Sequence, residues 1–182
     1  YQVKHQIDGT LTDNLGRPAY RVTRYIRKTA ANPWTPDNTF MAVPTEFAME
    51  FIENNMRFLK LKGPIRDAFT WKGNSFIDTY SLNSNVKYLD DWDYTYENVN
   101  TAETVGTFNL DSTLHVNQRD EIIGNPNDAN SYSEINFGAE KYARGIGMVY
   151  RNFLHVEYQP PTPGRGGYRI GYGVKMIMID HN

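Results

Sequence analysis

The chain has 182 residues, enough for one domain with a sizeable core, and its 14% of aromatic residues is typical of strand-rich proteins. Its 19 Lys and Arg against 21 Asp and Glu exclude a general basic surface, so no nucleic-acid partner is expected. The absence of cysteine excludes disulfides, thiolate metal sites and a cysteine nucleophile, and no apolar run approaches the ~20 residues of a membrane helix.

The first third of the chain is predicted to form strands joined by turns. Apolar and polar side chains alternate over residues 3–7, and the stretch DNLGRP at residues 13–18 predicts a turn. A β-hairpin is therefore expected over residues 1–28. The segment 40–65 fits either a short helix or two strands around a bend, and the second interpretation is preferred.

Aromatic side chains in the middle of the chain supply the candidate ligand-binding residues. If residues 88–96 form a strand, one face is aromatic and the other is acidic. The tight-turn composition of residues 72–74 should deliver the preceding indole to a core or a pocket. Such rings stack on sugars or form partner-binding patches, but they also form cores, and both interpretations stay open. The candidates are Trp71, Trp92, Tyr94 and Tyr96.

The stretch EKYARGIGMVYRNF, residues 140–153, contains only part of a nucleotide-binding fingerprint. A third glycine would have to stand at Tyr150, and a helix would have to follow, whereas the pattern stays strand-like. On a continuous strand, Ala143, Gly145 and Gly147 share one face, which predicts a bare stripe under a neighbouring ring or backbone. Gly145 and Gly147 are thus the predicted structural glycines, and no cofactor is expected.

The C-terminal segment is predicted to be a central strand. In residues 174–179 both alternating sets of side chains are largely apolar, which is typical of a strand covered on both faces. The preceding GRGG at residues 164–167 is predicted to be a turn, because it lacks the features of a phosphate-binding loop.

Histidines offer the only catalytic alternative. They are His5, His115, His155 and His181. None forms an H-x-x-x-H or H-E-x-x-H pair, so no metal site is expected, and no serine occupies a G-x-S-x-G elbow. The enzyme interpretation is a hydrolase that uses His155 or His115 with carboxylates from neighbouring strands.

Two stretches carry a resemblance that covers most of the chain. Residues 53–76, ENNMRFLKLKGPIRDAFTWKGNSF, follow the pattern ENN…fvkL.fP…tWdGN.fN, and residues 140–153 follow vYAkGiGlvyrE. The chain thus resembles a family of uncharacterised lipoproteins from Bacteroidetes. It departs from the family pattern at Lys72, Ile77 and Asn152, which argues against a fixed acidic site at those positions.

The resemblance implies secretion across the inner membrane, attachment through a lipidated N-terminal cysteine, and no enzymatic activity. A chain that begins after the signal and the anchor would look like this one. The localisation expected from the resemblance is the cell envelope, with the membrane reached only through that anchor.

Together these patterns predict a mainly β protein, with α+β as the alternative. We expect a single domain over residues 1–182, built as an antiparallel curved sheet or half-barrel with one or two short helices. The expected function is non-enzymatic, either structural or the binding of an apolar molecule, a glycan or an envelope protein.

Overall fold

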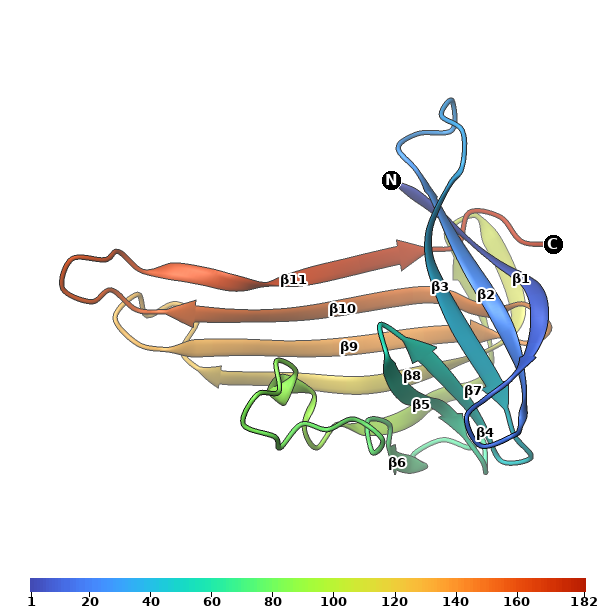
Figure 1. Cartoon of the computed structure of the whole chain (residues 1–182), viewed down its shortest axis with the longest axis horizontal. Helices are drawn as coiled ribbons and strands as arrows, with labels where there is room; N and C mark the ends of the chain where they lie inside the picture. Colours follow the sequence, from blue (N-terminus) through green and yellow to red (C-terminus); the bar gives the residue numbers. More distant parts are fainter. The chain divides into compact units, whose positions relative to one another are not determined.

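The computed structural model describes residues 1–182, and its contacts divide the chain into two compact units. The first unit comprises residues 1–64 and 73–91, and the second comprises residues 65–72 and 92–182. Nearly all regular structure is antiparallel β, and the one helix is the 3₁₀ turn Lys87–Leu89 (Figure 1). The predicted mainly β, antiparallel fold is confirmed, with its strands divided between two sheets.

A five-stranded antiparallel sheet forms the first unit, and each strand pairs with its neighbour in the chain. Its strands are β1 Gln2–Thr12, β2 Pro18–Arg27, β3 Thr35–Pro44, β4 Ala48–Glu53 and β5 Met56–Lys62. The predicted hairpin over residues 1–28 is therefore confirmed, and so is the strand interpretation of residues 40–65. Asn54 and Asn55 join β4 to β5 with φ values of 53° and 62°, as two-residue hairpin turns require.

Charged side chains tie the β1–β2 turn to the middle of this sheet. Arg17 donates to Glu50 from Nη1 over 2.8 Å and from Nη2 over 2.6 Å, and its Nε donates to Asp13 over 2.9 Å. Arg57 also bonds Glu50, and it reaches the amide oxygen of Asn14 over 2.9 Å. Two guanidinium groups thus balance two buried carboxylates, so neither acid lies in the interior without compensation.

The second unit contains a six-stranded antiparallel sheet in the order β11-β10-β9-β8-β7-β6. Its strands are β6 Thr70–Lys72, β7 Asp93–Val105, β8 Phe108–Gly124, β9 Ser133–Ala143, β10 Gly147–Gln159 and β11 Tyr168–Ile177. Here too every strand pairs with its chain neighbours, so the sheet is a meander of hairpins without crossovers. The four C-terminal strands run side by side along the length of this sheet (Figure 1).

The predicted bare stripe of glycines is wrong, because residues 144–146 are a turn between β9 and β10. Gly145 and Gly147 have φ values of 76° and 106°, a region that side chains with a Cβ rarely adopt. A Cβ added to either glycine would meet nothing within 4 Å. The two residues are needed for the backbone conformation of the turn, and they do not serve close packing.

The prediction of a central C-terminal strand is also wrong. β11 is the edge strand of the six-stranded sheet and pairs only with β10. All of its residues except Tyr168 and Met176 are exposed. Both faces of β11 carry apolar side chains, but both are largely exposed because the strand lies at the edge of the sheet. The sequence pattern had predicted that both faces would be buried.

Candidate functional site

The four predicted aromatic residues lie in the interior. Trp71, Trp92, Tyr94 and Tyr96 have exposed fractions of 4%, 1%, 1% and 0%. The Trp71 ring lies 4.5 Å from that of Tyr96 and meets that of Tyr94 edge-on at 5.7 Å. These three side chains form one cluster on β6 and β7, whereas Trp92 belongs to another group. Their binding role stays a prediction, since none presents a ring face to solvent here.

The predicted strand over residues 88–96 exists only from Asp93 onward. The 3₁₀ turn occupies Lys87–Leu89, and Asp91 has a φ of 56°, which interrupts an extended backbone. Trp92 therefore lies just before the strand, next to this bend, and does not share a regular strand face with Tyr94 and Tyr96.

Trp92 packs on a bare position of the sheet. Its ring stacks against Phe153 with centroids 6.0 Å apart, and it covers Gly138, which is the register partner of Phe153. A Cβ on Gly138 would stand 2.7 Å from Cζ3 of Trp92 and 2.9 Å from Oε1 of Gln118. The close approach of an aromatic ring to a glycine, expected near Gly145, occurs at Gly138 instead.

A row of mostly polar side chains runs across four strands of the same sheet face, two residues along β10 from Phe153. Glu121 on β8 is directly opposite Asn136 on β9, which is opposite His155 on β10, which is opposite Tyr172 on β11. Directly opposed residues project to the same side of a sheet. We call these four residues the His155 row.

Hydrogen bonds orient the imidazole in this row. The amide nitrogen of Asn136 donates to Oε1 of Glu134 over 2.7 Å and to Oε2 of Glu121 over 3.2 Å. Its oxygen lies 2.8 Å from Nδ1 of His155 and is an acceptor, so Nδ1 must carry the proton. In the neutral ring the basic nitrogen is then Nε2, which lies 3.6 Å from Oε1 of Glu157.

Burial sets the charge of this group. Removal from water lowers the pKa of His155, and the nearby carboxylates of Glu134 and Glu157 oppose that effect. Tyr132 donates its hydroxyl proton to Oε2 of Glu134 over 2.8 Å. Burial and this carboxylate raise the pKa of Tyr132, which keeps the phenol protonated as a donor.

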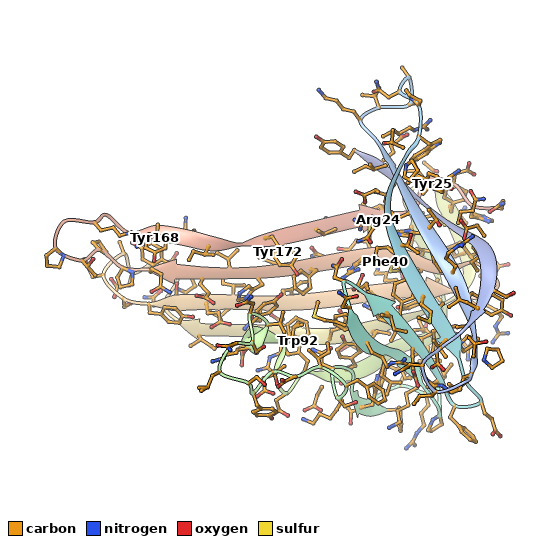
Figure 2. All side chains as sticks on the ribbon, in the orientation of Figure 1. Arg24, Tyr25, Phe40, Trp92, Tyr168 and Tyr172 are labelled. Atoms are coloured by element: carbon orange, nitrogen blue, oxygen red, sulfur yellow. The ribbon has the colours of Figure 1, made fainter.

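Part of the row is accessible from solvent. Tyr172 is 53% exposed, and it projects from the middle of β11 (Figure 2). Its ring lies 5.1 Å from that of Phe153, which braces it from one side. The side chains of Glu121 and Glu157 are 30% and 33% exposed. The exposed ring of Tyr172 on β11 thus stands diagonally across from the Glu157 carboxylate on β10, whereas Glu121 lies at the far end of the row on β8.

The second histidine of the hydrolase interpretation lies at another place in the same sheet. His115 Nε2 is 2.6 Å from Oε2 of Glu103, which also forms an ion pair with Lys141. Burial acts to raise the pKa of Glu103, but the hydrogen bonds and positive charges of Lys141 and His115 outweigh this effect, so the pKa is lowered. No group of three histidine, aspartate or glutamate side chains is arranged to hold a metal ion.

Sequence reasoning singled out His155 but missed its partners. Glu134 and Asn136 are two residues apart, as are His155 and Glu157, so on strands each pair shares one polar face. This spacing is a signal that the sequence does contain. Only the pairing register shows that these faces coincide, and register depends on contacts between residues distant in sequence.

Comparison of the chain with protein-family models, with curated proteins and with solved structures found no match. None of its helical residues forms a segment of the length and apolarity that spanning a membrane requires.

Proposed function

We propose that this chain is a non-enzymatic binding module of a cell-envelope lipoprotein and that its ligand is a glycan. The observation that carries the proposal is the exposed ring of Tyr172 beside the partly exposed carboxylate of Glu157 on the neighbouring strand. An aromatic ring stacks on the apolar face of a sugar, and carboxylates accept hydrogen bonds from its hydroxyl groups. Gln159 donates from Nε2 to Oε2 of Glu157 over 3.3 Å and holds this carboxylate in place.

A binding experiment tests the ligand class. We would screen neutral oligosaccharides of glucose, mannose and xylose by thermal shift and measure the affinity of any that stabilise the protein. Tyr172→Ala should weaken binding about tenfold through lost stacking. Tyr20→Ala is the matched control, because Tyr20 is 41% exposed on the other sheet, and it should leave affinity unchanged. Equal loss in both variants, or no binding by any sugar, contradicts the proposal.

The envelope location is supported by the resemblance of residues 53–76 and 140–153 to lipoproteins. Fractionation of cells that produce the full-length protein tests it. The protein should sediment with membranes and should be released by detergent but not by high salt, because an acyl anchor is held by the hydrophobic effect. Recovery in the soluble fraction would contradict this location.

A hydrolase is the second candidate, and the orientation of His155 favours it. Its Nδ1 proton is held by Asn136, and burial keeps the ring neutral, so Nε2 is the basic nitrogen near Glu157. Incubation with the same oligosaccharides and with chromogenic esters separates the two candidates. A binding module leaves them intact, whereas a hydrolase releases product at a rate that His155→Gln abolishes.

A further inference from the structure

The edge strand β11 carries a second interaction surface, its outer backbone edge, which shares only Tyr172 with the proposed glycan site. An edge strand exposes a row of backbone N–H and C=O groups that can pair with another chain. The register of β11 with β10 runs from Tyr168 to Ile177 without a bulge, and the strand contains no proline. Two common devices that block such pairing are therefore absent.

One hydrogen bond at the end of β11 shows which of its amides point outward. The N–H of Met178 donates to the carbonyl of Val149 over 2.9 Å, so residue 178 faces β10. Because these groups alternate along an antiparallel strand, the even-numbered residues of β11 bond β10 and the odd-numbered ones point away. The outward set is Arg169, Gly171, Gly173, Lys175 and Ile177.

The side chains of β11 divide by the same alternation. Ile170, Tyr172 and Val174 lie on the face of the His155 row with exposed fractions of 54%, 53% and 40%. The opposite face has Arg169 and Lys175 on either side of two glycines. A neighbouring strand would therefore meet apolar side chains on one face and two cations around a bare gap on the other.

We propose that β11 binds an extended segment of a protein partner in which apolar and acidic residues alternate. Its apolar side chains pack beside Ile170, Tyr172 and Val174, and its carboxylates pair with Arg169 and Lys175. The partner's backbone pairs with the outward amides, as in other complexes formed by strand addition. A second copy of this chain fits worse, because its own β11 would bring two more cations and no carboxylate.

The test uses the whole protein, labelled with ¹⁵N, and a synthetic peptide that alternates glutamate and valine and matches β11 in length. Binding should slow hydrogen exchange at the amides of Gly171, Gly173 and Lys175, which point outward. The amides of Tyr172 and Val174 already bond β10 and should change little. A peptide of the same composition with its glutamates and valines in two blocks should not bind.

Two single variants at Lys175 separate charge from backbone pairing, and a double variant tests charge alone. Lys175→Gln and Lys175→Pro both remove the cation, but only the proline removes the outward N–H. We expect a few-fold loss of affinity for the first and loss of detectable binding for the second. The double variant Arg169→Glu and Lys175→Glu should weaken binding on the order of tenfold. Melting temperatures show that each variant is folded.

The proposal is overturned if the blocked peptide binds as well as the alternating one. It is also overturned if exchange of the outward amides does not change on addition of the alternating peptide. Protection of these amides without peptide, rising with protein concentration, would identify a second copy as the occupant and would likewise overturn it. Pairing with the outward amides of β11 does not require sugar binding, so absence of sugar binding would contradict only the glycan proposal, and failure of the two proposals is distinguishable.

Discussion

Arg17 holds Glu50 through a bidentate pair, although the two residues are 33 positions apart in the sequence. The pair connects the end of the first hairpin to β4 and places a carboxylate that is 5% exposed under two guanidinium groups. Two parallel hydrogen bonds fix the geometry of both groups, which a single contact between flexible side chains does not.

This pair makes the protein sensitive to acid. Arg17, and after it Arg57, lowers the pKa of Glu50, so the folded state binds a proton less readily than the unfolded chain. The stabilisation is present above the unfolded pKa of about 4.3 and is lost as pH falls through the folded value. Urea unfolding followed by circular dichroism should therefore show a smaller decline in acid for Glu50→Gln than for wild type. The exposed Glu46→Gln is the control and should follow wild type.

The turn between β9 and β10 predicts a difference between two glycines. Gly145→Ala forces a Cβ into a φ of 76° and should destabilise the protein by about 1 kcal/mol. A Cβ at Gly166 also meets nothing within 4 Å, and no unusual φ is required there, so Gly166→Ala should be nearly neutral. Equal unfolding free energies for the two variants would show that φ does not limit position 145.

The aromatic cluster on β6 and β7 predicts a large loss of stability. Trp71 is 4% exposed and contacts two buried tyrosines, so Trp71→Ala should cost about 3–5 kcal/mol of unfolding free energy. Leu82 is 93% exposed, and Leu82→Ala should cost little. A Trp71→Ala variant of normal stability that has lost sugar binding would instead place this residue in the ligand site.

The His155 row predicts a defined imidazole state. Burial lowers the pKa of His155, so its ring should be neutral at pH 7, and ¹⁵N shifts should report a proton on Nδ1. As pH falls through about 6.5 the unfolded chain gains a proton first, which reduces stability. Asn136→Asp places a carboxylate against Nδ1 and should raise the pKa of His155. An unchanged or lower pKa in this variant would contradict the contact.

Local chemistry explains why some of this architecture could be predicted and some could not. The alternation and turn composition of residues 1–28 are local, and they predicted the hairpin correctly. The exposure of β11 depends on its place in the sheet, because an edge strand and a central strand can carry the same apolar pattern. The stripe at Gly145 failed for a related reason, since a glycine in a turn and a glycine under a ring look alike in sequence.

The site follows the same division. His155 could be singled out by residue type, but its bond to Asn136 joins strands whose register no local pattern specifies. The four aromatic candidates could be chosen from the sequence as large rings in strand-like segments. Whether these rings are buried or exposed depends on the other segments that pack over them, which the local sequence does not specify. The partners of His155 therefore could not be predicted, because they lie on other strands and only the strand register brings them together.

The meander order of both sheets has a consequence for how the chain folds. Because every strand pairs with its neighbour in sequence, each new pairing closes the loop of one hairpin, and no pairing has to wait for a more distant strand. Each sheet can therefore grow by adding one hairpin arm at a time. We expect rapid folding for a β protein of this size, with β11, the last strand of the series, joining a template that is already complete.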